Sequence, residues 1–447
     1  MKKSLRFGAV IAIAAATTIA LASCGSTGPS SSSKGGVSSI KVVIAEYSKD
    51  HTKKFWDAFA TKYEKTTGVK LNLQIINWND LDQQSSTMVQ TGNVPDILNE
   101  NAYASYAADG LLYNSDEVLP AATKADIIPA FVKSGTYKGK FYGMPDLSSA
   151  RALFYNTELF DKAGISKPPT TWDEFTADAK KVEAIGDGSV GYAQPLGPEE
   201  AQAEFAIWLF NNGGDFKKDG KWTLNSAANV KTLEYMKDLS VKDKVTQNNP
   251  GSTNRTDGAF SLFEQGKAGM IVGFSPLQAA LDTQYTDVKY AIAPMPSGDN
   301  ADPQTYGVTD YLMSFKKKGN EAAVKAFYKL YYSPSEINTW IKAEGFLPVT
   351  TTGLKEFGSD PKLKVYLDTL PNIHLTPTDD PEWDKIKLTI QQNIGLAVAP
   401  NGDPKKFFER NCASARLATR VSTTTETTQM PVLPTTRGRS GLVRKPT

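Results

Sequence analysis

Cysteine and histidine are almost absent from this chain of 447 residues. The two cysteines are Cys24, near the start, and Cys412, near the end, and the two histidines are His51 and His374. A body folded from the residues between the cysteines has no disulfide, so its stability must come from packing. With so few histidines and cysteines, a metal cluster or a histidine-based catalytic triad has few possible members. We therefore expect no catalytic residues, no metal and no cofactor. The nucleotide-binding pattern Gly-x-x-x-x-Gly-Lys-Ser/Thr is also missing, so the chain does not hydrolyse nucleotides itself.

Long apolar runs are also scarce, and the one that stands out lies at the N-terminus. Basic residues at positions 2, 3 and 6 precede an apolar run over residues 7–22, which is typical of an export signal and short for a bilayer span. Its end, Leu21-Ala22-Ser23-Cys24, resembles a lipobox, the processing site of bacterial lipoproteins. The pattern predicts a signal peptide over 1–23 and a lipid-anchored Cys24 on the outer, extracellular or periplasmic, face of the cell membrane. The alternative is an ordinary secretory signal with a chance cysteine.

Both ends of the remaining chain look unlike a folded domain. Residues 24–39 are mainly Gly, Ser and Thr, which predicts a flexible tether. Before residue 407 the only arginines are at positions 6, 151 and 255, whereas six follow it, in a stretch rich in Thr, Ser and Pro. We therefore expect 407–447 to be an atypical, disordered tail that results from a reading-frame change near Phe407. A natural basic tail is the alternative.

Acidic and basic residues are nearly balanced, with a formal net charge of +2. The tail contributes +5 of this, so the part before it carries about −3, and about −6 once the basic residues of the signal are removed. A body of this charge does not favour binding to nucleic acid.

The first hundred residues alternate between strand and helix patterns. Strands are predicted at 40–45, 69–76 and 95–98, with helices from Asp50 to Gly68 and over 81–91. This order predicts a parallel sheet, and ligands of such sheets bind beyond the carboxyl ends of the strands. The residues there are Glu46, Tyr47 and Ser48 after the first strand, and Asn99, Glu100 and Asn101 after the third. The alternative is that these are ordinary surface turn residues. Further along, Thr171 and Glu174 have the spacing of a helix capping box.

Five short motifs, in order and at matching spacing, resemble the family 1 extracellular solute-binding proteins, the sugar receptors of ABC importers that are similar to maltose-binding protein. They are Gly92-Asn93-Val94-Pro95-Asp96-Ile97, Tyr155-Asn156-Thr157-Glu158-Leu159-Phe160, Pro169-Thr170-Thr171-Trp172-Asp173-Glu174-Phe175, Phe263-Glu264-Gln265-Gly266-Lys267-Ala268-Gly269-Met270 and Gly345-Phe346-Leu347-Pro348. The resemblance implies an α/β, two-lobed periplasmic-binding-protein-like fold of type II, in which three crossover segments form a hinge.

The resemblance also implies where the lobes divide. We expect 40–150 and 308–345 in the first lobe and 151–307 and 346–406 in the second, with crossovers near 149–153, 305–310 and 345–348. Family members usually end in a further helix where this pattern stops after Lys406, so the second lobe is expected to lack a packing element.

A sugar offers apolar faces and a ring of hydroxyls, so its receptor needs aromatic rings and charged or amide groups. By position in the resemblance, the candidate rings are Tyr47, Trp208, Phe274 and Trp383. The candidate hydrogen-bonding residues are Glu46, Asn99, Glu100, Asp146, Arg151 and Asp310. Core packing is the alternative for both tryptophans, and an arginine partner within the protein is the alternative for Asp310.

The sequence therefore predicts a monomeric, non-enzymatic lipoprotein that captures a carbohydrate, a di- or oligosaccharide, by hinge closure. By the resemblance, it would deliver this solute to membrane permease subunits of an ABC importer. Within the receptor class, the alternative ligand is another polar solute such as a polyol or a glycerol phosphate. A surface lipoprotein glycosidase and a surface adhesin are the other two classes considered.

Overall fold

The computed structural model describes residues 36–298, 304–360, 363–367 and 373–410. Contacts divide the chain into Met1–Gly36 and Val37–Thr447, and the fold given below is that of the second unit. The predicted signal peptide, Cys24, most of the tether and all of the tail beyond Arg410 lie outside the described residues. None of the helices in the described part is both long and apolar enough to cross a membrane.

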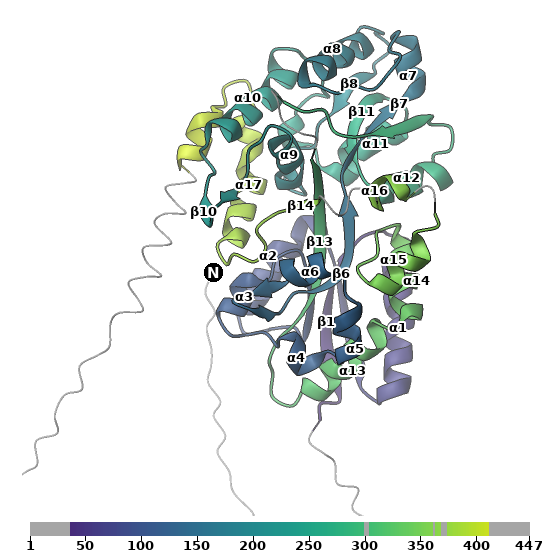
Figure 1. Cartoon of the computed structure of the whole chain (residues 1–447), viewed down its shortest axis with the longest axis vertical. Coiled ribbons are helices and arrows are strands. Elements are labelled where there is room, and N and C mark those ends of the chain that lie inside the picture. The colour runs from purple at the N-terminus through teal and green to yellow at the C-terminus, as the bar shows by residue number, and fades with distance from the viewer. Residues whose placement is uncertain (1–35, 299–303, 361–362, 368–372, 411–447) are drawn as a thin grey trace, which may run out of the picture. The chain divides into compact units, whose positions relative to one another are not determined.

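The first sheet has the strand order β14-β13-β3-β1-β2, with β6 paired to β13 (Figure 1). Strands β1 (Ser39–Glu46), β2 (Lys70–Asn77) and β3 (Ile97–Glu100) are parallel, which confirms the predicted pattern. Strand β13 (Thr305–Ser314) runs antiparallel to β3 and to β6 (Met144–Ala150), and β14 (Ile373–Leu375) is parallel to the start of β13. An apolar run such as that of β1 is stable here because helices cover both faces of the sheet.

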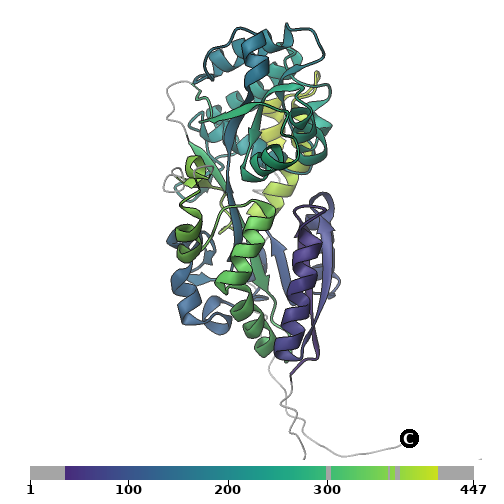
Figure 2. The same cartoon turned by 90° about the vertical axis from the view of Figure 1, so that its right-hand side faces the viewer.

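Helix α1 (Thr52–Thr67) shows why the local sequence folds as it does. Its apolar residues recur at helical spacing, so Phe55, Trp56, Phe59 and Tyr63 are all buried along one stripe. The helix ends at Gly68, whose φ of 72° is left-handed and therefore suits glycine. Figures 1 and 2 show α1 in purple beside the strands of the first sheet.

The other elements around the first sheet are mostly helical. They are α2 (Trp78–Gln90), α3 (Ala104–Ala108), α4 (Ser115–Val118), α5 (Ala121–Asp126), α6 (Pro129–Ser134), the small hairpin β4 (Thr136–Tyr137) and β5 (Lys140–Phe141), α13 (Glu321–Tyr331) and α14 (Pro334–Glu344). The ring of Trp56 stacks on Phe327 and Tyr331 of α13, which fixes α1 against α13. We call this sheet with its helices the first lobe.

The second sheet has the order β12-β7-β11-β8. Its strands are β7 (Ala152–Asn156), β8 (Val190–Ala193), β11 (Ala268–Gly273) and β12 (Tyr290–Ala293), and β7 is antiparallel to both β11 and β12. The surrounding elements are α7 (Thr157–Lys162), α8 (Trp172–Glu183), α9 (Ala201–Phe210), the hairpin β9 (Lys217–Lys218) and β10 (Lys221–Trp222), α10 (Ala227–Val241), the 3-10 turn η1 (Pro250–Ser252), the π-helix η2 (Arg255–Phe260), α11 (Ser261–Glu264), α12 (Ser275–Thr283) and α17 (Trp383–Ala397). We call this group the second lobe.

The start of α8 bears out half of the predicted capping box. The Thr171 Oγ1 accepts a hydrogen bond from the Glu174 N–H at 3.2 Å, as predicted. The Glu174 carboxylate, however, accepts from the Thr170 N–H at 2.7 Å and not from the N–H of the capping residue. The first contact satisfies an N–H group that the helix itself leaves free, and the second ties the residue before the cap to the helix.

Strands β6 and β13 lie side by side and run from the first sheet toward the second (Figure 1). The chain passes from β6 to β7 through Arg151, within the predicted first crossover, and it reaches β13 from β12 through residues 294–304.

The third crossover lies later in the chain than predicted. Residues 346–357 belong to the first lobe and not to the second, because the Ile128 N–H donates to the Val349 carbonyl at 3.0 Å and α15 (Thr351–Phe357) contacts α14. Helix α16 (Lys364–Leu367) lies near α12 of the second lobe (Figure 1). Burial raises the pKa of Tyr366 on α16, and the nearby charge of Asp282 on α12 raises it further. The chain therefore crosses after residue 357.

Residues 404–410 form a helix that the sequence analysis did not expect. The prediction that the body ends at Lys406 is wrong, because Phe407 and Phe408 are 9% and 1% exposed and belong to the core of the second lobe. The ring of Phe408 lies 5.6 Å from that of Phe205 on α9. The reading-frame change itself stays a hypothesis.

The buried position of Phe408 gives a stability prediction. Replacing Phe408 with Ala leaves a cavity against α9, so we expect the free energy of unfolding to fall by about 3–5 kcal/mol. Chemical denaturation of the variant measures this, with Lys406→Ala, at an exposed position two residues earlier, as the control. An unchanged midpoint for Phe408→Ala would contradict the packing role of this helix.

Candidate functional site

A cavity of about 610 Å³ lies where residues of the two lobes meet. The first lobe contributes Tyr47, Ser48, His51, Trp78, Asn101, Lys342, Glu344 and Phe346, and the second contributes Glu199, Glu200, Arg255, Phe260, Glu264 and Phe274, among others. The connecting strands contribute Ser149, Arg151, Val308 and Asp310. The volume falls within the range of about 300–1,000 Å³ that is usual for small-molecule sites.

Aromatic rings line the cavity from both lobes. In the first lobe, the ring of Tyr47 meets the rings of Trp78 and Phe346 edge to face, with centroids 5.5 Å and 5.3 Å apart. In the second lobe, Phe274 lies 6.0 Å from Phe346 and carries the Arg151 guanidinium over its ring at 3.7 Å. Rings held in this way give flat apolar surfaces to a ligand at little entropic cost.

The two arginines of the cavity share one carboxylate. Glu200 accepts two hydrogen bonds from the Arg151 Nη2, at 2.7 Å and 3.0 Å, and its Oε2 lies 2.6 Å from the Arg255 Nε. The Arg255 Nη2 also donates to Glu204 at 3.0 Å. Burial alone would lower the pKa of Arg255, but Glu200 and Glu204 hold it above its ordinary value. Both guanidiniums are therefore neutralised by the protein.

A chain of hydrogen bonds leads from the cavity into the first lobe. The Tyr47 hydroxyl lies 2.9 Å from the Asp310 Oδ2 and 3.1 Å from the Asn99 Oδ1, and it donates to one of these at a time. The Asn99 Nδ2 donates to Asp146 at 3.0 Å, and the other oxygen of Asp146 accepts from Trp340 at 3.1 Å. These contacts hold the ring of Tyr47 in position at the cavity wall.

Asp310 is a buried carboxylate at the cavity wall. Its Oδ1 is buried and has no hydrogen-bond partner within the described part of the chain. A buried acceptor without a partner is costly, so a ligand that donates a hydrogen bond there gains affinity. Burial also raises the pKa of Asp310 and of Asp146 from 3.8 to about 7.

Four of the predicted ligand residues line the large cavity, namely Tyr47, Arg151, Phe274 and Asp310. Two more, Asn99 and Asp146, are buried directly behind Tyr47. Glu46 lies off the cavity, at the end of β1, where it accepts a hydrogen bond from Asn77 at 3.0 Å. Glu100 is 5% exposed and lies 3.6 Å from the Lys387 ammonium, so it too is outside the cavity wall.

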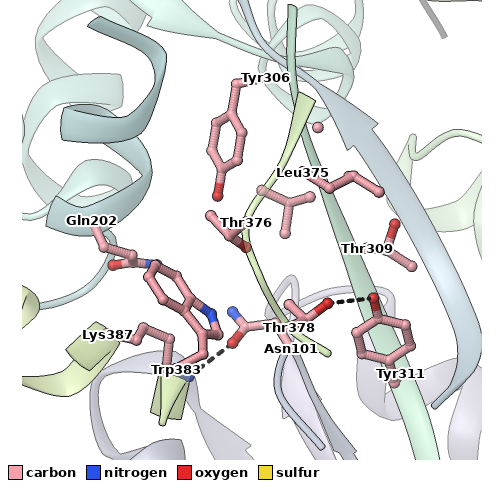
Figure 3. A pocket seen from close by; sticks show the side chains of 12 residues that line it. Asn101, Gln202, Tyr306, Thr309, Tyr311, Leu375, Thr376, Thr378, Trp383 and Lys387 are labelled. Carbon is pink, nitrogen blue, oxygen red and sulfur yellow. Dashed lines mark hydrogen bonds between the residues drawn. The ribbon is translucent and has the colours of Figure 1, made fainter. Parts of the chain in front are cut away.

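The two predicted tryptophans do not line this cavity. Trp208 is fully buried in the second lobe, where its Nε1 lies 3.0 Å from Glu204, so its assignment as a ligand residue is corrected to a core position. Its segment Ala206–Phe210 is apolar on every side, which is typical of a buried helix. Trp383 is 2% exposed and lines a separate small cavity of about 10 Å³ with Asn101, Gln202 and Tyr306 (Figure 3).

Sequence reasoning missed several residues of the cavity. Trp78 directly follows β2, so the rule that selected Tyr47 and Asn99 could have found it. Arg255 is one of three arginines before the tail, which marked it as unusual but gave it no location. For Glu199 and Glu200 the sequence offered no signal, because their position depends on how the second lobe folds. No group of His, Cys, Asp or Glu that could hold a metal ion occurs in the described ranges.

Two α/β lobes joined by paired strands, with a mixed aromatic and charged cavity between them, define a two-lobed ligand-binding protein. The chain belongs to the bacterial extracellular solute-binding proteins, because the sequence profile of that family matches residues 58–365. This is a family of binding proteins and not of enzymes.

Known relatives agree with this assignment. A Brucella abortus (strain 2308) protein described as a binding protein is 28% identical, over 84% of this chain and 92% of its own length. The diacetylchitobiose binding protein DasA of Streptomyces coelicolor is 26% identical over 66% of this chain and 69% of its own. The sn-glycerol-3-phosphate-binding periplasmic protein UgpB of Yersinia pestis is 29% identical over 48% of this chain and 50% of its own length. A sugar transporter protein from Arthrobacter chlorophenolicus A6, solved with laminaribiose, has the same fold, with a TM-score of 0.74 at 20% identity over 85% and 99% of the chains.

The burial of Asp310 predicts how stability changes with pH. Its carboxyl binds a proton more tightly in the folded chain than in the unfolded one, so this group favours folding at low pH and loses that effect as the pH rises through about 7. The variant Asp310→Asn cannot ionise. We therefore expect its stability to increase relative to the wild type as the pH rises from 4 to 7, by up to about 4 kcal/mol, and to change little more up to pH 8.

Thermal unfolding of both proteins across this pH range is the measurement. The exposed Asp57→Asn is the control and should follow the wild type at every pH. If the difference in stability between Asp310→Asn and the wild type stays constant with pH, the raised pKa of the buried Asp310 carboxyl is contradicted.

Proposed function

We propose that this protein is the substrate-binding subunit of an ABC importer and that its ligand is a neutral carbohydrate of two or three units. The observation that carries this is the combination of aromatic rings from both lobes with the unpartnered Asp310 oxygen in one cavity. A sugar ring packs its C–H face on an aromatic plate and donates a hydroxyl hydrogen to a carboxylate. The cavity volume of about 610 Å³ suits a ligand of this size.

The charges of the cavity disfavour a phosphate. Its wall carries five carboxylates, Glu199, Glu200, Glu264, Asp310 and Glu344, against Arg151, Arg255 and Lys342. Since both arginines already share Glu200, a phosphate dianion would have to displace that residue and would then face the remaining carboxylates. We therefore favour the sugar over glycerol phosphate, although UgpB is among the relatives. A polyol has the same hydroxyl chemistry and stays as the alternative that binding experiments must separate.

Closure of the two lobes is the mechanism we propose. The cavity wall comes from both lobes, so a ligand makes all its contacts only when they are together. Binding then shifts the population toward the closed form without changing the ligand chemically. The paired strands β6 and β13 and the segment after residue 357 are where the backbone must bend. The closed form would be recognised by permease subunits on other chains.

The same proposal includes a membrane anchor. The basic start, the apolar run over residues 7–22 and Leu21-Ala22-Ser23-Cys24 support export and lipidation at Cys24. A tether over 24–39 would then let the body capture solute close to the permease.

Direct binding measurements test the ligand class. Isothermal titration with mono-, di- and trisaccharides, polyols and glycerol 3-phosphate should give saturable binding for one class of neutral saccharide and none for the phosphate. The ligand should be recovered unchanged. A Phe274→Ala variant and an Asp310→Ala variant should each weaken binding at least about tenfold, which corresponds to about 1.4 kcal/mol.

The exposed Leu396→Ala, near the end of α17 and outside the cavity lining, serves as the control and should bind as the wild type does. Tight binding of glycerol 3-phosphate, or turnover of the sugar, would overturn the proposal. Binding of polyols alone would move the assignment to the alternative.

The anchor is tested by Cys24→Ser in a bacterial host that processes lipoproteins. The wild-type chain should take up labelled palmitate and sediment with membranes, whereas the variant should take up no label. Equal labelling of the two proteins would contradict lipidation at Cys24, and absence of label from both would point to an ordinary secretory signal.

A further inference from the structure

Lys387 extends from the second lobe into the first. It lies on α17, which packs against α9 through Trp383 and Ile390 in the core of the second lobe. Its ammonium donates to the Asp82 Oδ1 on α2 at 3.0 Å and to the Asn101 Oδ1 after β3 at 2.8 Å. Both acceptors belong to the first lobe, so these two hydrogen bonds join the lobes.

This lysine is almost completely buried, with 3% of its side chain exposed. Burial alone would lower the pKa of Lys387, but Asp82, Glu100 and Asp384 raise it above its ordinary value. The ammonium therefore stays charged and pairs with Asp82 at 3.0 Å, with Glu100 further away at 3.6 Å, whereas burial raises the pKa of Glu100 and of Asp384. Moving the Lys387 ammonium away would leave these acidic side chains close together without a counterion, which is costly.

A second contact from the start of α17 also reaches the first lobe. The Ser105 hydroxyl on α3 donates to Asp384, three residues before Lys387. The first turn of α17 is thus bonded to α2, α3 and the end of β3 at once. By contrast, the bond that Asn254 donates to Asn79 across the lobes, at 3.2 Å, is exposed and uncharged.

The bond from Lys387 to Asn101 lies at a residue that borders two cavities. Asn101 lines both the large cavity and the small one that contains Trp383, and Figure 3 shows the Lys387 to Asn101 hydrogen bond at the edge of the small cavity. In the small cavity, Gln202 is 3% exposed and its Oε1 has no hydrogen-bond partner within the described residues. An aromatic ring and an unpartnered amide are suited to one more sugar unit, but about 10 Å³ holds no more than a water molecule.

We propose that Lys387 is a clasp that determines the length of the ligand. In the closed form, it holds α17 on the first lobe and closes the compartment of Trp383. Short saccharides bind in the large cavity with the clasp shut, whereas longer chains bind only after it opens and the two spaces join. The statement on length rests on the proposed function, but the clasp itself does not.

The clasp is tested without ligand. Spin labels at Gln83→Cys on α2 and Lys221→Cys on β10, in the full chain with Cys24→Ser and Cys412→Ser, report the distance between the lobes by pulsed electron resonance. We expect Lys387→Met to add a population at longer distance, and the exposed Lys385→Met on the same helix to leave the distribution unchanged. The same distribution in Lys387→Met and wild type would overturn the clasp. Should Lys387→Met fail to fold, Asp82→Asn replaces it with the same expectation.

The length preference is tested by titrating the same variants with the maltose, laminaribiose and chitobiose series from two to five units. For the series that the wild type binds, Lys387→Met should raise the affinity for four units relative to two by about tenfold or more. Equal factors for all lengths would overturn the role in length selection. If the wild type binds no member of these series, the proposed function fails, while the distance measurement still decides the clasp.

Discussion

The pairing of buried charge at the cavity wall is the constraint on which the site depends. Charged groups removed from water must find partners, and here Glu200 serves both Arg151 and Arg255. Arg151 lies on the segment that connects the lobes, and its guanidinium covers Phe274. Glu200 therefore fixes an aromatic wall and, together with Glu204, neutralises the two cations, which leaves the cavity without a free positive charge at that wall.

The opposite wall is arranged by hydrogen bonds that start from the first lobe. Asp146 is anchored by Trp340 and Asn99, and Asn99 and Asp310 together hold the hydroxyl of Tyr47. This arrangement leaves one Asp310 oxygen without a partner. A site with paired cations and an unpaired acceptor favours a donor-rich neutral ligand, and binding such a ligand satisfies the acceptor.

Much of the fold follows from local patterns in the sequence. The parallel strands β1 to β3 and the stripe of α1 were predictable because periodicity and end signals act over a few residues, whereas the passage through Arg151 was predicted from the resemblance to the family. Phe407 and Phe408 were misassigned because the arginine-rich composition of the tail begins just after them, whereas their burial depends on contact with α9. The late third crossover was missed for the same reason, since a change of lobe leaves no local pattern.

The site was only half predictable. The strand-end rule found Tyr47 and Asn99, and the expectation that a carboxylate within an apolar strand needs a partner led to Asp310. Glu200 and Lys387 were missed because nothing near them in sequence distinguishes them from surface residues. Their partners, Arg151, Arg255 and Asp82, come from distant segments.

A crystal structure of the protein with the saccharide that binds best is the most direct test of the account. We predict that the sugar lies in the cavity between the lobes, with a ring face against Phe274 or Trp78 and a hydroxyl within hydrogen-bond distance of the Asp310 Oδ1. A sugar that contacts only one lobe, or that lies outside this cavity, would contradict the account.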